Sequence, residues 1–392
     1  MSAVPPRSPS RSAIRPLVFR KRLGAPSEGF IDDQARHLPT AQAAFLGLEC
    51  VDGAAVDLCG PVLTPSRNGA ARALARLRAS LGLGLSRDLT SRLRSFAPTL
   101  VHAHFATSGS TPLEVARACG VPLLVTAHGY DVTRNRLRRR DARRRAVLLE
   151  AATRVIAVSD FITSKLADLG IPREKVVRHY MGIDPRPFAG AKSEADAPTV
   201  LFIGRLTEVK GCGILLDAMR IVSAKIPEAR LRFIGDGPLR DSLRAQARDM
   251  PSVEFLGVQD RARIARELQS AWVHCVPSVP LENGSEEALG LVFLEAQASG
   301  TPTVSFDSGG VPEAIEHGKT GYALKERSPS ALAEPLIELL RSHRLRRQLG
   351  EAGRARVQSM FDVREQSRGL ERIYLEAMCL HGFGSHTDPS TP

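Results

Sequence analysis

The chain has 392 residues, of which 43% are hydrophobic and 24% charged, a length and composition typical of a soluble globular protein with two domains. No apolar run approaches the roughly 20 residues of a membrane-spanning helix, and the basic, Pro- and Ser-rich N-terminus lacks the apolar segment of a secretory signal. The six cysteines include no C-x-x-C pair, which disfavours a zinc site or a disulfide framework and favours a reducing cytoplasm.

The net charge of +12 is concentrated in the first half of the chain. Residues 1–190 hold 29 Lys and Arg against 15 Asp and Glu, whereas residues 191–392 hold 25 against 27. A basic face attracts anionic lipid, nucleic acid or a phosphate-bearing substrate. A general bias toward arginine in the composition would produce the same counts, so charge alone does not choose a partner.

The first half alternates apolar strands with helical segments. A first strand over 14–19 precedes a helix that begins near Gly29, and amphipathic helical spacing covers 70–96. The remaining predicted elements are strands over 99–106, 123–127, 154–158 and 175–179, a helix over 111–119, and an arginine-rich segment, 134–145, that leads into a helix ending near 152. This alternation predicts a doubly wound parallel sheet with ligands at the C-terminal strand ends.

The second half repeats the same pattern after a linker. Its predicted strands are 199–203, 230–234, 253–256, 272–276 and 303–306, and its helices include 213–224, 261–269 and 290–299. We therefore predict an α/β protein with a disordered N-terminus over 1–12, a first domain over 13–184, a linker over 185–197 and a second domain over 198–362. A last helix over 363–380 is expected to cross back to the first domain, and 381–392 is expected to be a disordered tail.

The stretch 277–313 carries the strongest chemical signal. Glu287 and Glu295 lie eight residues apart around a predicted helix start. At the rise of a helix their backbones are at most roughly 12 Å apart, which is too far for both carboxylates to bind the same atom. They suit two acceptors of hydroxyl hydrogen bonds at opposite ends of an elongated polyol. Between them, the free backbone N–H groups of 288–291 would form a seat for a diphosphate.

Two strings resemble one enzyme family. E-A-L-G-L-V-F-L-E, followed by G-G-V-P-E, resembles the E-x7-E signature of retaining glycosyltransferases of family 4, which use nucleotide-sugar donors on two facing Rossmann-like domains (the GT-B fold). Gly204-Arg205-Leu206 with Lys210-Gly211 resembles the G-R-L-x-x-x-K-G motif of the same enzymes. The sequence departs from the family at Ala288, where Gly is common; the extra methyl would narrow the loop.

The resemblance implies roles for individual residues. The first domain would bind the acceptor and the second the donor. Glu287 would hold the transferred sugar and stabilise its transition state, and Glu295 would bind the ribose hydroxyls. The donor diphosphate would be bound by the remaining donor-site residues, which are Gly204, Arg205, Lys210, Leu289, Gly290 and Leu291.

A second group of candidates follows a strand of the first domain. His128 closes that strand, where functional side chains of such sheets lie, and in the family the matching H-G is near the donor sugar and the acceptor. Tyr130 and Asp131 are expected on the acceptor side. His102 and His104 flank an apolar strand and fit either a structural role or a place in the cleft.

We therefore predict a retaining hexosyltransferase that uses a UDP- or GDP-sugar and a saccharide or lipid-linked saccharide acceptor in polysaccharide biosynthesis. No D-x-D metal motif is present, so we expect neither a metal nor another cofactor. The basic first domain predicts contact with the inner face of the plasma membrane. The alternatives are a GT-B nucleotide-sugar epimerase or phosphorylase and a non-enzymatic polyanion or nucleic-acid binder; the last is disfavoured by only 5% aromatic residues.

Overall fold

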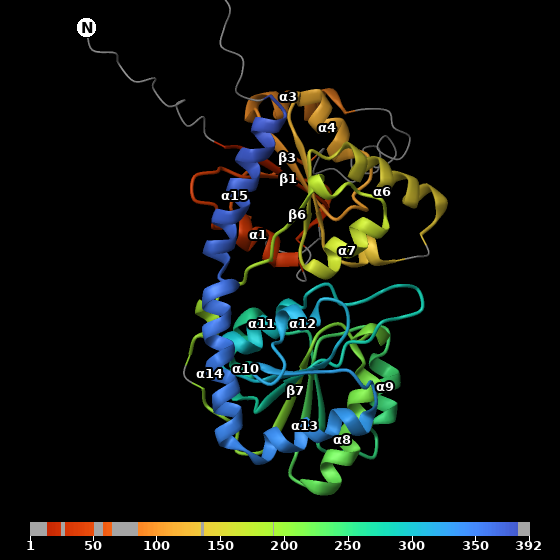
Figure 1. Cartoon of the computed structure of the whole chain (residues 1–392), viewed down its shortest axis with the longest axis vertical. Coiled ribbons are helices and arrows are strands. Elements are labelled where there is room, and N and C mark those ends of the chain that lie inside the picture. The colour runs from red at the N-terminus through yellow and green to blue at the C-terminus, as the bar shows by residue number, and fades with distance from the viewer. Residues whose placement is uncertain are drawn as a thin grey trace, which may run out of the picture.

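The computed structural model describes residues 14–24, 28–50, 58–64, 85–134, 137–190 and 192–382. The segments predicted to be disordered, 1–12 and 381–392, lie outside these residues, except that 381 and 382 form a turn. The predicted amphipathic region 70–96 is described only from residue 85 onward. The described chain forms two α/β lobes, one above the other in Figure 1, which confirms the predicted fold class.

The first lobe is built on a six-stranded parallel sheet with the order β2-β1-β3-β4-β5-β6. Its strands are β1 (Pro16–Leu23), β2 (Ala44–Cys50), β3 (Leu100–His104), β4 (Leu123–Ala127), β5 (Arg154–Ala157) and β6 (Val176–Arg178). β3 and β4 are buried over their whole length, as expected for central parallel strands covered by helices on both faces. β2 was not anticipated from the sequence; it pairs with β1 at the edge of the sheet.

The second lobe holds a sheet of the same kind, with the order β12-β11-β10-β7-β8-β9. Its strands are β7 (Thr199–Ile203), β8 (Arg230–Ile234), β9 (Val253–Gly257), β10 (Val273–Cys275), β11 (Thr303–Phe306) and β12 (Gly321–Leu324). All neighbouring strands are parallel. In both lobes the chain therefore leaves the strands at one edge, where the loops that carry the candidate residues begin.

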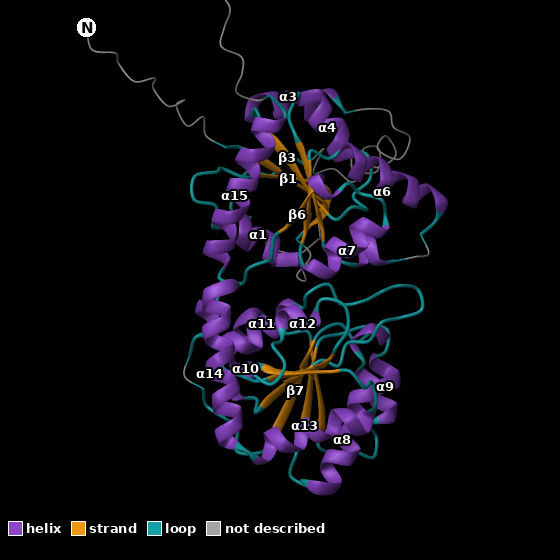
Figure 2. Cartoon of the chain, in the orientation of Figure 1, coloured by secondary structure: helices purple, strands orange, loops and turns teal. Residues whose placement is uncertain are grey.

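Helices surround each sheet (Figure 2). Those of the first lobe are α1 (Gly29–Arg36), α3 (Arg87–Phe96), α4 (Thr111–Cys119), α5 (Tyr130–Thr133), α6 (Arg139–Ala151) and α7 (Asp160–Asp168). Those that follow are α8 (Cys212–Lys225), α9 (Arg240–Gln246), α10 (Arg261–Ser270), α11 (Leu291–Ala298), α12 (Val311–Ala314), α13 (Pro329–Arg341), α14 (His343–Met360) and α15 (Val363–Leu380). No helix within these described ranges combines the length and apolarity needed to cross a membrane.

The last helix, α15, lies on the first lobe rather than the second (Figure 1). Its buried side chains, among them Leu370 and Tyr374, join a hydrophobic cluster that includes residues of β1 and α1. The Glu371 carboxylate accepts the backbone N–H of Thr40 at 3.0 Å. The chain thus passes between the lobes twice, and the two passages are hydrogen-bonded to each other: the Ile183 N–H donates to the Phe361 carbonyl at 2.9 Å.

Candidate active site

The centre of the candidate site is an ion pair between two loops of the second lobe. Lys210 ends a short turn after β7, and Glu287 lies in the loop before α11; the Lys210 Nζ donates to the Glu287 carboxylate. The Ser278 Oγ donates to the same carboxylate oxygen at 3.3 Å. Both charged side chains are largely buried, so their attraction is screened by water less than that of a surface pair. The structure thus brings two of the predicted residues together.

Gly211 explains how these loops come so close. It has a φ of 65° and lies against the Pro277 carbonyl oxygen, which would be 2.0 Å from a side chain at position 211. Only glycine tolerates both the left-handed backbone and this approach. Gly211 therefore allows the turn that ends in Lys210 to lie close to the loop that carries Ser278.

The helix start next to this ion pair is also formed as the sequence predicts. α11 begins at Leu291, with Gly290 at its N-cap in a left-handed conformation, φ 84°. The first N–H groups of any helix have no partner within it and favour an anion. The Leu289 side chain is buried in the hydrophobic core of the second lobe, so only its backbone is available to a ligand at the helix start. Gly290 lies beside Glu287: a Cβ there would be 3.5 Å from the Glu287 Cδ.

Two predicted residues lie apart from this pair. Arg205 follows Gly204 at the end of β7 with an exposed side chain; within the described parts of the chain, no salt bridge is found for it. Glu295 is partly buried on α11, and burial raises the pKa of its carboxyl to about 7, with Arg261 opposing and Asp33 adding to the effect. Asp33 belongs to α1 and Arg261 to α10, so Glu295 faces the region between the lobes.

His128 lies at the C-terminal edge of the first sheet, directly after β4. Its Nε2 is 2.9 Å from the Nδ1 of His104, the last residue of β3, and its ring is 4.5 Å from that of Phe105. Burial lowers the pKa of His128 to about 3, with additional effects from His102 and Arg20. A neutral imidazole whose orientation is fixed by its neighbour is suited to hydrogen bonding with a sugar hydroxyl.

Asp131 has a different place from the one expected. Its carboxylate is fully buried and accepts backbone N–H groups from Ala106 at 2.7 Å, His128 at 3.0 Å and Gly129 at 2.8 Å. Burial raises its pKa to about 6, while these hydrogen bonds lower it. The side chain therefore shapes the loop that carries His128 and does not itself point toward an acceptor. Tyr130 is exposed, with 47% of its surface accessible, and remains available to a ligand.

The two lobes touch at the candidate site. Gly129 has a φ of 130°, and a Cβ built on it would lie 2.8 Å from the Cβ of Ala288. Ala288 packs against the hydrophobic cluster of the first lobe. The loop after His128 therefore lies directly against the residue next to Glu287, and the methyl group that distinguishes Ala288 from the usual glycine fills this contact.

A second contact between the lobes uses Glu313, the glutamate of G-G-V-P-E, for which the sequence suggested no role. Its carboxylate accepts the N–H groups of Asp160 at 2.7 Å and Phe161 at 2.9 Å, at the start of α7. The Tyr180 hydroxyl also donates to it, at 3.1 Å. A carboxylate from the second lobe thus caps a helix of the first, where the helix dipole favours negative charge.

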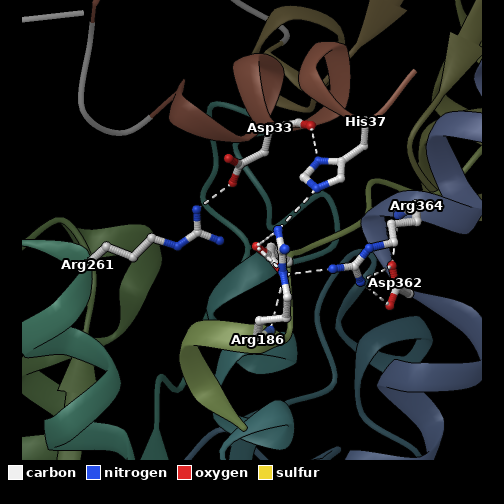
Figure 3. A network of polar contacts seen from close by, with 7 residues as sticks. Asp33, His37, Arg186, Arg261, Asp362 and Arg364 are labelled. Atoms are coloured by element: carbon white, nitrogen blue, oxygen red, sulfur yellow. Dashed lines mark hydrogen bonds and ion pairs between the residues drawn. The ribbon is translucent and has the colours of Figure 1, made fainter. Parts of the chain in front are cut away.

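A third set of contacts lies near the two passages of the chain (Figure 3). Arg261 pairs with Asp33 at 2.6 Å, and Arg186 approaches the His37 ring at 3.4 Å. Arg364 pairs with Asp362 at 3.2 Å. These partly exposed pairs each contribute little to stability, and two of them, Arg261–Asp33 and Arg186–His37, connect α1 and its C-terminal end to the segments opposite it on the side where Glu295 lies.

Across the residues that are described, no group of three or more His, Cys, Asp or Glu side chains is arranged to hold an ion.

Each half of the chain matches a known protein family. Residues 186–356 match the family described as Glycosyl transferases group 1, and residues 56–186 match Glycosyltransferase Family 4. The second match ends and the first begins at residue 186, close to the first passage between the lobes.

Individual relatives agree with these matches. The chain is 28% identical over 279 residues to the amylovoran biosynthesis glycosyltransferase of Erwinia amylovora, covering 70% of this chain and 69% of the relative. It is 31% identical over 255 residues to a GDP-mannose-dependent phosphatidylinositol monomannoside mannosyltransferase of Mycobacterium tuberculosis, covering 61% and 66%. Its fold is similar to that of Anabaena HepE, crystallised with UDP and glucose, with a TM-score of 0.74 and 21% identity over 92% of this chain and 99% of that one.

Proposed function

The chain belongs to the family 4 glycosyltransferases with the GT-B fold, and on this basis we propose that it transfers a hexose from a nucleotide sugar to a saccharide or lipid-linked saccharide in polysaccharide biosynthesis. The observation that carries the proposal is the Lys210–Glu287 ion pair beside the start of α11. It puts a cation, a carboxylate and free helix N–H groups within one small region. Phosphate and sugar hydroxyls need these three kinds of partner.

The donor diphosphate would bind at the start of α11. There the helix N–H groups and Lys210 would balance the charge that the leaving nucleoside diphosphate gains as the glycosidic bond breaks. Arg205 is exposed and can turn toward the phosphates, where its guanidinium can hold two oxygens at once. Lys210 would exchange part of its contact with Glu287 for the phosphate. Relatives named for GDP-mannose and a structure with UDP support both nucleotides as candidates.

The transferred sugar would lie between the lobes. Glu287, held by Lys210 and Ser278, would accept hydroxyl hydrogen bonds and stabilise positive charge on the sugar ring in the transition state. His128 would contact the sugar or the acceptor from the opposite lobe. Because the Glu287 carboxylate is already held by two donors, we propose that it acts electrostatically and that the anomeric configuration is retained through substitution on one face of the sugar.

We also propose that transfer requires no divalent ion, because Lys210 and the start of α11 supply the positive charge that a metal would otherwise provide. The test is turnover in excess EDTA. Undiminished release of nucleoside diphosphate supports the proposal, whereas activity that is lost in EDTA and restored by magnesium contradicts it.

The acceptor would be presented at the inner face of the plasma membrane. The support is the charge of α6, whose first seven residues include five arginines, and basic segments bind anionic lipid surfaces. Flotation with vesicles tests this proposal: recovery with anionic vesicles and not with neutral ones supports it, and equal recovery with both contradicts it.

The experiment that tests the proposed activity is a thermal-shift screen of nucleoside diphosphates and nucleotide sugars. Ligands that bind the folded state raise the melting temperature, and the free-energy gain grows with the logarithm of the ratio of ligand concentration to dissociation constant. We expect UDP or GDP to stabilise the wild-type protein and to stabilise Glu295→Ala less. Products of an assay with saccharide acceptors would then distinguish transfer from epimerisation, which releases nucleoside diphosphate without a new glycosidic bond.

A further inference from the structure

A pocket of about 370 Å³ in the second lobe lies at the opposite edge of the sheet from the candidate active site. Gly300, in the pocket wall, comes just before β11, whereas Gly204 and Lys210 of the candidate site follow the end of β7. The strands of this sheet are parallel, so the start of one strand and the end of another lie at opposite edges. The pocket is therefore separate from the proposed donor site.

The wall of this pocket carries an excess of positive charge. Its charged side chains, among the described residues that line it, are four cations and two carboxylates: Lys192, Arg346, Arg347, Arg354, Glu194 and Glu351. Glu194 accepts two hydrogen bonds from the buried Arg346 guanidinium, at 2.8 and 2.6 Å. Glu351 accepts one from Arg347 at 2.8 Å. Both carboxylates are thus already paired, and in the part of the chain that the structure describes no salt bridge is found for Lys192 or Arg354.

Lys192 shows this excess in its hydrogen bonds and its pKa. Its Nζ donates to two backbone carbonyls and to the Thr301 Oγ1, all of which are neutral acceptors. Burial lowers the pKa of Lys192 to about 7; Glu194 opposes this effect, while Arg346 and Arg354 add to it. An anion in the pocket would favour the charged ammonium, because an opposite charge nearby offsets the cost of burial.

Arg354 is the second cation without a carboxylate. Its guanidinium donates to the carbonyls of Gly190 and Ser299 at 3.0 and 2.9 Å, and its buried Nε has no hydrogen-bond partner among the described residues. Gly300 leaves room for this guanidinium, since a Cβ at position 300 would be 2.7 Å from the Arg354 Nε. A guanidinium group can hold two phosphate oxygens at once, and an ammonium group adds a compact charge.

The space beside the pocket admits a ligand larger than phosphate. A second pocket of about 350 Å³ adjoins the first, because both are lined by His343 and Arg346. Trp272 also lines this second pocket, and the Arg346 guanidinium lies 4.0 Å from the centre of its ring. Trp272 is the only tryptophan in the sequence, so its fluorescence reports on this region alone.

The first pocket also lies between the two segments that pass from lobe to lobe. Lys192 follows the first passage, and Arg354 belongs to α14, which leads through the second passage into α15 (Figure 1). A ligand that contacts both side chains therefore joins two segments that continue into the first lobe.

From these contacts we propose that the pocket binds the phosphate group of a small anion between Lys192 and Arg354. The source of this group is either inorganic phosphate or a phosphorylated metabolite whose remainder extends toward Trp272. The proposal goes beyond sugar transfer, because the pocket lies at the other edge of the sheet and none of the residues that line it belongs to the candidate active site.

The test is a titration of Trp272 fluorescence with inorganic phosphate, glycerol 3-phosphate and acetate, at an ionic strength held constant with chloride. We expect a saturable change with either or both phosphate probes and none with acetate. Tighter binding of glycerol 3-phosphate would assign the site to a phosphorylated metabolite, and tighter binding of phosphate would assign it to the inorganic ion. Either result supports the proposal.

Three variants with opposite expectations accompany the titration. Arg354→Gln should weaken phosphate binding by about tenfold or more, since it removes a charge-assisted contact. Glu351→Gln should tighten it by about threefold, because the exposed Arg347 is then free for the anion. A gain of binding cannot result from partial unfolding. Arg220→Gln is the control, since it removes an exposed arginine of the same lobe outside the pocket and should bind as the wild type does.

Several results would overturn the proposal. They are the absence of a saturable change, an equal change with acetate, equal losses in Arg354→Gln and Arg220→Gln, or weaker binding in Glu351→Gln. Stabilisation by UDP or GDP is measured in the same proteins. If it is absent while the Trp272 titration persists, the proposed sugar transfer fails and the phosphate site stands; if it is present without a Trp272 titration, only the phosphate site fails.

Discussion

The Nδ1 of His104 lies 2.9 Å from the Nε2 of His128, so a hydrogen bond joins two histidines at the ends of two neighbouring strands of the first sheet. Burial lowers the pKa of both rings, and each stays neutral at physiological pH. One ring donates and the other accepts. His104 thereby holds the ring of His128 in a single orientation.

Replacement of His104 tests this orienting role. His104→Phe keeps an aromatic ring at this position but leaves the His128 nitrogen without its partner, which costs about 1–3 kcal/mol for a buried polar group. We expect sugar transfer to fall by about tenfold or more, while stabilisation by nucleoside diphosphate is unchanged. His104→Asn, which can still form a hydrogen bond, should recover part of the rate. Equal rates in the wild type and in His104→Phe would show that His128 needs no such support.

The contact between Gly129 and Ala288 predicts coupling between the lobes. Gly129→Ala puts a methyl group 2.8 Å from the Ala288 Cβ on a backbone with φ 130°, and we expect a loss of about 2–3 kcal/mol in the free energy of unfolding. Ala288→Gly removes the clash but not the backbone strain, so the double variant should recover part of that loss. Urea unfolding of the wild type, the two single variants and the double variant measures these free energies of unfolding. Strictly additive effects would mean that the two residues do not touch.

The raised pKa of Glu295 predicts a specific dependence on pH. Burial raises the pKa of its carboxyl from the ordinary glutamate value of 4.5 to about 7, so between these pH values the folded state holds more protons than the unfolded state. The contribution of Glu295 to the free energy of unfolding therefore falls as the pH rises through this window. Glu295→Gln removes the titration.

Melting temperatures of Glu295→Gln and the wild type, compared between about pH 5 and about pH 8, check this prediction. The variant should gain stability relative to the wild type as the pH rises to about 7, and the difference should then stay level. Other buried groups, such as Asp131 and the histidines, titrate in both proteins and cancel in the difference. A difference that does not change with pH would show that Glu295 is ordinarily ionised.

The contacts of Glu313 predict that its carboxylate stabilises the packing of the two lobes against each other. Glu313→Gln removes the negative charge at the start of α7 and weakens hydrogen bonds to the N–H groups of Asp160 and Phe161. We expect the free energy of unfolding to fall by about 1 kcal/mol. Glu316→Gln is the matched control, because the Glu316 carboxylate forms an ion pair with exposed Lys319 and such pairs contribute little. Equal changes in the two variants would contradict a clamp between the lobes.

The sequence predicted the fold better than it predicted the contacts around the site. Strands such as β7 are buried throughout and stand out as short apolar runs, so their presence and parallel arrangement follow from the alternation with helices, whereas their order within each sheet was not predicted. β2 was missed because A-F-L-G-L-E-C mixes glycine and glutamate with apolar residues, and its place depends on pairing with β1. Pairing between distant segments leaves no mark in a local pattern.

The same distinction holds for the candidate site. The proximity of Lys210 and Glu287 agrees with their shared resemblance to one family, since both motifs follow strands of one sheet. The burial of Asp131 did not follow from the sequence, because it depends on N–H groups from two separate loops. The role of Glu313 did not follow from its motif, since its partners lie at the start of α7, about 150 residues earlier in the chain.

The central claim is that Lys210 and Glu287 divide the work on the donor, Lys210 binding the diphosphate and Glu287 acting on the sugar. The most direct measurement compares UDP and GDP affinity and nucleotide-sugar turnover in Lys210→Met and Glu287→Gln, with folding verified by circular dichroism. We expect Lys210→Met to weaken nucleoside diphosphate binding by about tenfold or more. Glu287→Gln should keep that binding within about twofold and lower turnover by about 10²–10³-fold. Wild-type turnover in both variants would contradict the account.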